Sequence, residues 1–148
     1  MPRQESPLLY RRTPAGLNRR IVREFAVRVR EEVAGGRHFT CLITGDRELR
    51  RLNHEFLGKN YPADVLSFPS GEPGGSLGEI AISAGRAAAQ ARELGHTVER
   101  EICVLMLHGV LHLTGMDHER DRGRMARAET RWRQALGLPA GLIERVRR

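Results

Sequence analysis

The sequence predicts an α+β fold: one domain over residues 1–148, with a mixed four-stranded sheet packed with about five helices. Three observations favour this class. The length of 148 residues, with 40% hydrophobic and 29% charged residues, suits one globular domain. No repeat or linker-like tract divides the chain. Strand-like segments come early and helical patterns late, in the order β α β α β β α α α, which is typical of a layered α+β structure.

The first third of the chain predicts a strand, a helix and a second strand. Leu8–Arg12 is expected to be a short strand. Pro14 then opens a helix in its first turn, where a missing N–H costs nothing, and this helix ends at Gly35–Gly36. His38–Thr44 is apolar and β-branched and predicts the second strand. The apolar face of the helix is expected at positions that recur every four residues: Leu17, Ile21, Phe25 and Val29.

The middle of the chain predicts a helix and two strands. Asp46 is expected to be the N-cap of a helix over Arg47–Phe56, because its carboxylate can accept backbone N–H bonds. Val65–Phe68 is the third strand, which the proline at the next position ends. A turn over Glu72–Gly75 leads into a fourth strand over Leu77–Ser83, an arrangement suited to a hairpin.

Three helices are expected in the last third of the chain. The first is an alanine-rich helix over Gly85–Leu94. The next begins near Thr97 and reaches Thr114, and apolar residues surround most of it, so it should be the central, buried helix. The last begins at Asp117–Glu119 and runs to about Leu136, where a glycine and a proline follow.

The charge of the chain suggests an anionic partner. The formal net charge is +7, and every basic residue except Lys59 is arginine. The segment Arg120–Arg148 carries nine arginines against three acidic residues, and therefore most of the net charge. Nucleic acid is the first anionic partner to consider. Two interpretations of this segment stay open: a solvated helix face, or an edge that contacts phosphates.

Cysteine usage and hydropathy indicate a cytoplasmic protein. Cys41 and Cys103 lie far apart in sequence, which excludes a disulfide framework or a CxxC site and suits a reducing compartment. The longest apolar runs, such as Ile102–Leu107, are too short for a transmembrane helix. The segment Met1–Tyr10 lacks the apolar core of a signal peptide.

Three of the six histidines lie within one short segment and form a candidate metal site. His108 and His112 are four residues apart, so on a helix they project from one face, about 40° apart around the axis. Gly115 can end the helix with left-handed dihedral angles, after which the chain can bring His118 to the same ion. Three neutral imidazoles suit zinc, with nickel, copper and iron as alternatives.

A packing role for these histidines is the competing interpretation. Burying three unpaired imidazoles in an apolar helix would be costly, which favours the metal site. The sequence offers no evident fourth ligand, and three protein ligands plus water are typical of catalytic zinc. Asp117 is close in sequence, and a hydrogen bond to an imidazole N–H is a candidate role for it. A metal in such a site would lower the pKa of water from ~15.7 toward ~7.

The spacing H-x-x-x-H-x-x-G-x-x-H also occurs in metzincin peptidases. Those enzymes place a glutamate general base directly after the first histidine, where this chain has Gly109. The general base that peptide cleavage would need is therefore missing from this position. In a basic chain, a phosphodiester is the better substrate candidate, because a metal can polarise the phosphoryl oxygen and arginines can bind the backbone.

Three segments resemble the YbeY family of bacterial single-strand endoribonucleases. His108–His118 reads H-G-x-L-H-L-x-G-x-D-H, which is similar to the family signature. Asp64–Pro69 resembles the family strand T-D-V-L-S-F-P, with Ala63 at the usual threonine. Leu77–Ser83 resembles L-G-D-I-x-I-S, with Glu79 at the usual aspartate.

The resemblance implies a zinc-dependent endoribonuclease that acts in maturation of 16S ribosomal RNA and in ribosome quality control. It implies one zinc per chain, with nickel or another divalent metal as an alternative, held by His108, His112 and His118 in a cleft beside the sheet. The implied partners are single-stranded or ribosomal RNA and components of the small ribosomal subunit. After Leu-Asn the family commonly has an arginine that faces the cleft, and this chain has His54 there, which can still donate to phosphate or act as an acid or base.

Two other functions remain as alternatives. An RNA- or ribosome-binding assembly factor with a structural metal would need no general base, and the sequence shows no evident one. A metallopeptidase is the third hypothesis, which Gly109 disfavours.

Overall fold

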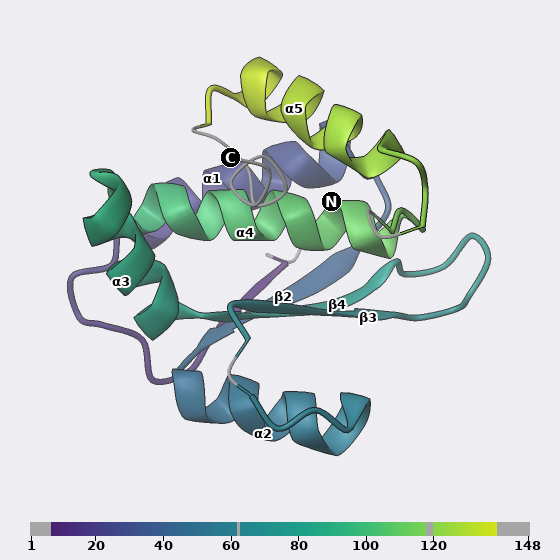
Figure 1. The fold of residues 1–148 in the computed structure, drawn as a ribbon. Coiled ribbons are helices and arrows are strands. Elements are labelled where there is room, and N and C mark those ends of the chain that lie inside the picture. The colour runs from purple at the N-terminus through teal and green to yellow at the C-terminus, as the bar shows by residue number, and fades with distance from the viewer. Residues whose placement is uncertain (1–6, 62, 118–119, 139–148) are drawn as a thin grey trace, which may run out of the picture.

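A computed structural model of the chain describes residues 7–61, 63–117 and 120–138. Four strands and five helices follow one another in these ranges (Figure 1). Their bounds are β1 (Leu8–Tyr10), α1 (Arg19–Glu32), β2 (Phe39–Thr44), α2 (Asp46–Leu57), β3 (Val65–Pro69), β4 (Gly78–Ser83), α3 (Ala84–Leu94), α4 (Val98–Leu113) and α5 (Arg124–Leu136). The predicted α+β class and the four-stranded mixed sheet are confirmed.

The sheet has the order β1-β2-β4-β3. Strands β1, β2 and β4 are parallel, with Cys41 of β2 paired to Leu8 on one side and to Ile80 on the other. Strand β3 is antiparallel to β4, with Ser67 opposite Ile80, so the expected hairpin is present. It places β3 at the edge of the sheet and in contact with α4, where Ser67 bonds to the carbonyl of Gly109, the residue after His108.

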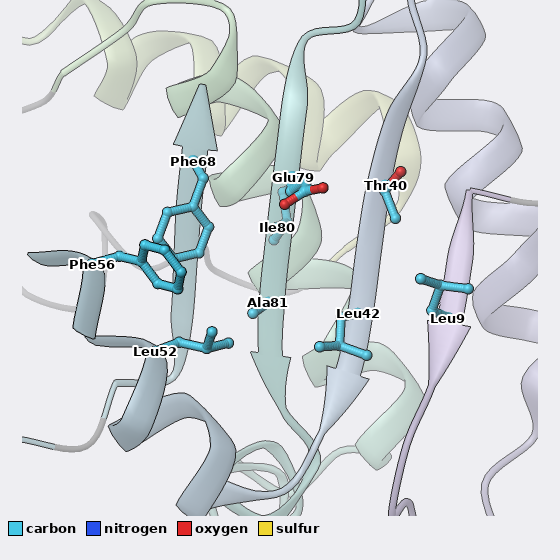
Figure 2. A pocket seen from close by; sticks show the side chains of 9 residues that line it. All are labelled: Leu9, Thr40, Leu42, Leu52, Phe56, Phe68, Glu79, Ile80 and Ala81. Atoms are coloured by element: carbon cyan, nitrogen blue, oxygen red, sulfur yellow. The ribbon is translucent and has the colours of Figure 1, made fainter. Parts of the chain in front are cut away.

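The helices cover the two faces of the sheet unequally. Helix α4 lies on one face, with α1 and α5 beyond it, whereas α2 lies on the opposite face (Figure 1). On the α2 side, a largely apolar pocket of ≈ 320 Å³ remains open (Figure 2). Leu52 and Phe56 of α2 and Phe68 of β3 line this pocket, together with Glu79. Glu79 therefore belongs to the α2 face, away from the histidines.

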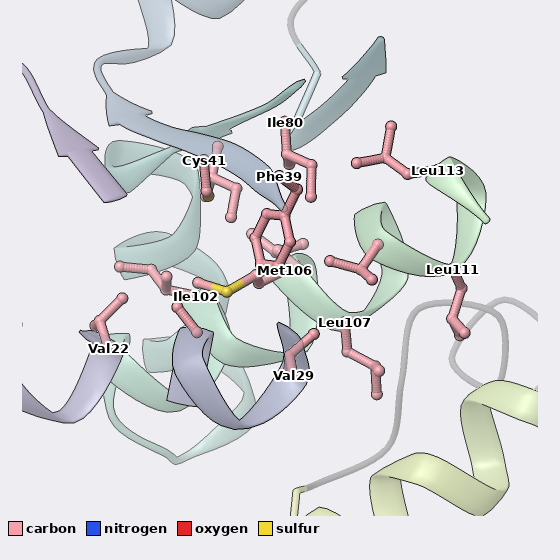
Figure 3. Packing of buried hydrophobic residues seen from close by; sticks show 14 of the residues in the cluster. Val22, Val29, Phe39, Cys41, Ile80, Ile102, Met106, Leu107, Leu111 and Leu113 are labelled. Atoms are coloured by element: carbon pink, nitrogen blue, oxygen red, sulfur yellow. The ribbon is translucent and has the colours of Figure 1, made fainter. Parts of the chain in front are cut away.

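Helix α4 forms the centre of the core, as its sequence predicts. Ile102, Met106 and Leu107 are fully or almost fully buried, and they pack among Val22 of α1 and Phe39 of β2 (Figure 3). Removing such side chains from water is the main source of stability, about 1.5–3 kcal/mol for each. Thr97 accepts a hydrogen bond from the backbone N–H of Arg100, which caps the helix at the predicted start.

The first helix begins later than predicted. Pro14 lies in a turn in which its carbonyl accepts from Leu17, and α1 starts at Arg19 with Asn18 as its N-cap. The side-chain oxygen of Asn18 accepts from the N–H of Ile21. The buried stripe also differs: it contains Val22, Ala26, Val29 and Arg30, whereas Ile21 is 46% exposed. The helix begins after Asn18 because this side chain accepts a hydrogen bond from a helical N–H and so stabilises the first turn, whereas a proline in the first turn is only tolerated.

Two other helix starts differ from the prediction. Asp46 is the first residue of α2, and Gly45 takes the N-cap position. The last helix begins at Arg124, beyond the predicted Asp117–Glu119, because Arg122 and Gly123 adopt positive φ angles of 56° and 86°. Residues 118 and 119 lie outside the described ranges.

Among the helices that the structure describes, none has the length and apolar character to span a membrane.

Candidate metal centre

A cleft of ≈ 510 Å³ lies between the C-terminal end of α4, strand β3 and the loop that follows α2. His108 and His112 line it from α4, and Ser67 lines it from β3. The segment after α4 contributes Gly115, Met116 and Asp117. The hairpin that places β3 beneath α4 therefore builds one wall of the cleft, and the helix builds another.

His108 and His112 face the same cleft, as their i,i+4 spacing predicts. Their ring centroids are 4.8 Å apart, with an angle of 73° between the ring planes. His108 is buried, and His112 is partly exposed. Two imidazoles in this arrangement can direct one nitrogen each toward a common point, which is the geometry that a shared metal ion requires.

Glu129 of α5 fixes the orientation of His108. Its Oε2 lies 2.8 Å from Nδ1 of His108, and the Glu129 side chain is 1% exposed. An ionised carboxylate only accepts hydrogen bonds, so beside one Nδ1 donates, and in the neutral ring the lone pair is then on Nε2. A carboxylate behind a histidine in this way is typical of metal sites, where it holds the ring and raises its basicity.

Sequence reasoning missed Glu129, although a signal for it exists. Met125, Glu129 and Trp132 follow one another at helical spacing, so an acidic residue lies on the apolar stripe of α5. Met125 and Glu129 are both buried, and Trp132 packs against the core. A lone carboxylate on a buried face needs a partner. The sequence could thus have marked Glu129 as paired, but not with His108.

The third predicted ligand, His118, lies outside the described residues. Within the described ranges, no group of three or more histidine, cysteine or acidic side chains is placed to hold a metal. Asp117 lines the cleft, and its Oδ2 is 3.8 Å from Nε of Arg120. The structure thus brings two of the three predicted ligands together and places Asp117 beside them.

Gly109 lies where α4 packs tightly on the sheet. A Cβ atom at this position would lie 3.0 Å from Cγ2 of Ile80 and 3.2 Å from Oγ of Ser67. The same Ser67 hydroxyl donates a 3.1 Å hydrogen bond to the carbonyl of Gly109. A larger side chain at this position would press on Ile80 and Ser67, which would have to shift by a few tenths of an ångström to make room for it. The close packing of α4 on the strands therefore favours a small residue where the metzincin pattern has its general base.

The end of α2 and the loop after it form part of the wall of the cleft. Asn53 and Leu57, one helical turn apart on α2, line the cleft, and Lys59 and Tyr61 follow on the loop. His54 is exposed on α2 and is not among the described residues that line the cleft. The structure thus places His54 beside the cleft wall but not on it, and its proposed contact with RNA stays a prediction.

The two cysteines lie in the core, away from this chemistry. Burial raises the pKa of the Cys103 thiol to about 12, and burial also raises the pKa of Cys41, with the neighbouring Cys103 adding to the shift. Both thiols therefore stay protonated at neutral pH, in a form that binds metals and attacks substrates poorly.

These features define a class: an α+β protein with an imidazole-lined cleft at the edge of a mixed sheet. The family model Endoribonuclease YbeY matches residues 15–137. An Endoribonuclease YbeY of Solibacter usitatus is 64% identical over 141 residues, which cover 95% of each chain. That of Koribacter versatilis is 42% identical over 139 residues, covering 94% of this chain and 91% of the relative. The chain belongs to the Endoribonuclease YbeY family, as the resemblance of its motifs predicts.

A solved structure agrees with the fold. The solution structure of a Thermotoga maritima protein superimposes with a TM-score of 0.57 at 27% sequence identity. The match covers 84% of this chain and 86% of that chain.

Proposed function

We propose that this protein is a zinc-dependent endoribonuclease that cleaves single-stranded RNA and acts in the maturation of 16S ribosomal RNA. The observation that carries the proposal is the pair His108 and His112 on one wall of a cleft, with Glu129 behind His108. The relatives that are named Endoribonuclease YbeY over nearly the full chain support the same activity.

The donor set fits a zinc ion. Nε2 of His108 and a ring nitrogen of His112 are borderline donors that suit Zn²⁺, with nickel or another divalent metal as an alternative. His118 completes the set by its place in the sequence. One ion per chain, when bound, would supply Lewis acidity toward a phosphoryl oxygen and lower the pKa of a water molecule.

The residues of the chain bind and orient the substrate. Lys59 lines the same cleft as the histidines and gives it a positive charge, at which an RNA phosphate can dock. Asp117, which lines the same cleft, is a candidate to accept a proton or to hold His112 or His118. His54 does not line the cleft but is the neighbour in sequence of Asn53, which does. We propose that His54 acts as an acid or base or contacts a phosphate of the RNA.

RNA is favoured over a peptide by charge and by packing. A net charge of +7 attracts a polyanion. Gly109 has no side chain that could act as the glutamate base of the metzincin pattern, and a Cβ there would lie only 3.0 Å from Ile80. We further propose that the partners are ribosomal RNA and components of the small ribosomal subunit, as the family resemblance implies.

Cleavage of an end-labelled single-stranded RNA tests this function. We expect cleavage by the purified chain, loss of cleavage with a chelator, and recovery when zinc is added. His112→Ala should be inactive with an unchanged circular dichroism spectrum, and His38→Ala, which alters an exposed histidine before β2, should cleave normally. Equal cleavage by the His112→Ala variant would show that this site does not perform the reaction.

A further inference from the structure

The loop after α2 carries two side chains that suit a nucleotide. Tyr61 is 51% exposed, and Nζ of Lys59 lies 5.9 Å from the centroid of its ring. Both residues line the cleft that contains His108 and His112. A half-exposed aromatic ring beside an ammonium group can receive the base and the phosphate of one nucleotide.

We propose that Lys59 and Tyr61 form a nucleotide-binding subsite next to the histidines, in which Tyr61 stacks on an RNA base and Lys59 contacts a backbone phosphate. This inference rests on the proposed function and adds how the single strand is positioned. The subsite would hold one nucleotide of the strand while an adjacent phosphodiester lies near the histidines.

Asn53 holds this loop in place. Its side-chain amide donates a 2.8 Å hydrogen bond to the carbonyl of Tyr61, and its backbone carbonyl accepts from the N–H of Lys59. Asn53 is 1% exposed, so water competes little for these bonds. Gly58, with φ at 67°, ends α2 and turns the chain toward the cleft. One buried residue therefore holds the backbone of both subsite residues, which reduces the cost of ordering the loop on binding.

Tyr61 and Lys59 differ in chemical type from the other residues that line the cleft. Among the described residues that line the cleft, Tyr61 is the only Phe, Tyr or Trp, and Lys59 is the only Lys or Arg. Leu57 and Met116 add apolar surface against which a base can lie. One aromatic side chain supports the stacking of one base, which fits recognition of single strands with little readout of sequence.

The test is the binding of a fluorescent single-stranded oligoribonucleotide to the full chain as purified, at 4 °C, with a gel to verify that the probe stays intact. Tyr61→Leu should weaken binding on the order of 10-fold, and Tyr61→Phe should stay within about twofold, because stacking needs the ring and not the hydroxyl. The matched control is Phe56→Leu, since Phe56 is an exposed aromatic of α2 that lines the pocket on the other face (Figure 2).

Two further measurements separate the contribution of base stacking to RNA binding from that of the phosphate contact. A probe of the same length with abasic sugars should bind the unsubstituted chain and the Tyr61→Leu variant equally, because it offers no base to stack. Affinity falls as salt rises, and Lys59→Met should make the slope of log affinity against log salt shallower by about 0.7, the contribution of one phosphate contact in a single strand. Arg23→Met, which removes an exposed charge from α1, should leave that slope unchanged.

The outcomes distinguish this inference from the proposed function. If the chain cleaves RNA but Tyr61→Leu binds as tightly as Phe56→Leu, the subsite is wrong and the endoribonuclease function stands. If the unsubstituted chain neither binds nor cleaves single-stranded RNA, both proposals are overturned. Weaker binding only by the Tyr61→Leu and Lys59→Met variants, with normal controls, is the result that we expect.

Discussion

Nδ1 of His108 and Oε2 of Glu129 lie 2.8 Å apart, and both side chains are buried between α4 and α5. This bond joins the two helices beside the cleft that His108 lines. It gives the last helix a role in the site as well as in the core, because Glu129 determines which nitrogen of His108 can face the cleft.

Replacing Glu129 should weaken metal binding more than it weakens the fold. In Glu129→Gln the amide oxygen can still accept the hydrogen bond from His108, but the negative charge behind the ring is lost. We expect zinc affinity to fall by about 10- to 100-fold, which is typical when such a partner is changed. Competition with a chromophoric chelator measures this affinity. Glu24→Gln, on the exposed face of α1, is the control and should bind zinc normally.

Glu129→Ala distinguishes the effect of Glu129 on the orientation of His108 from its effect on the stability of the fold. This variant leaves the buried Nδ1 of His108 without its carboxylate, which costs about 1–3 kcal/mol of unfolding free energy. Urea denaturation without metal should show this loss for Glu129→Ala and a smaller loss for Glu129→Gln. Equal zinc affinity in all three proteins would contradict a role for Glu129 at the metal site.

Enlarging Gly109 should destabilise the protein. A side chain there meets Ile80 and Ser67, so Gly109→Val should lower the free energy of unfolding by about 1–3 kcal/mol, as overpacking does in other cores. Gly85 of α3 is a matched control, because a Cβ there has only Oγ of Ser83 nearby, at 3.9 Å. Gly85→Val should change stability by no more than about 0.5 kcal/mol. Equal effects in urea denaturation would show that α4 can move off the sheet without cost.

The two cysteines should be unreactive in the folded protein over a wide pH range. Burial raises the pKa of Cys103 to about 12 and also raises that of Cys41, so the thiolate fraction stays very small at pH 7 and pH 9 alike. A thiol reagent such as DTNB should find almost no reactive thiol until the chain is unfolded, when both react. Rapid reaction of either cysteine at pH 8 in the native protein would contradict the buried positions.

The exposed arginines of α5 test whether the basic C-terminal segment contacts RNA. Arg124 and Arg127 are exposed on the helix that carries Glu129. Changing both to glutamine should reduce the slope of log affinity against log salt by about 1.4, if each contacts one phosphate of a single strand. The same double change at Arg20 and Arg23 of α1 should leave the slope unaltered. An unchanged slope for the α5 variant would make these arginines a solvated helix face.

Much of the fold could be predicted from local signals in the sequence. The apolar segment between Thr97 and Gly115 predicts α4, because a threonine cap marks its start, a glycine with positive φ follows its end, and twelve of its 16 residues are buried. The start of α1 was predicted wrongly, because Pro14 and Asn18 are both acceptable helix starts and only the structure shows which N–H groups need a cap.

The site could be predicted only in part. The spacing of His108 and His112 predicts a shared face, and the structure confirms it. Glu129 and Tyr61 could not be assigned to the site, because their places depend on how α5 packs on α4 and how Asn53 holds the loop. Contacts between distant segments carry no local pattern, so spacing could mark Glu129 as a buried carboxylate that needs a partner, but it could place neither residue at the site.

The measurement that tests the central claim most directly is the metal content of the purified chain, by elemental analysis, beside His112→Ala and His38→Ala. We predict about one zinc per chain in the unsubstituted protein and in His38→Ala, and a large loss in a folded His112→Ala variant. A folded protein that takes up no divalent metal, even after zinc is added, would contradict the account, as would a His112→Ala variant that retains its zinc.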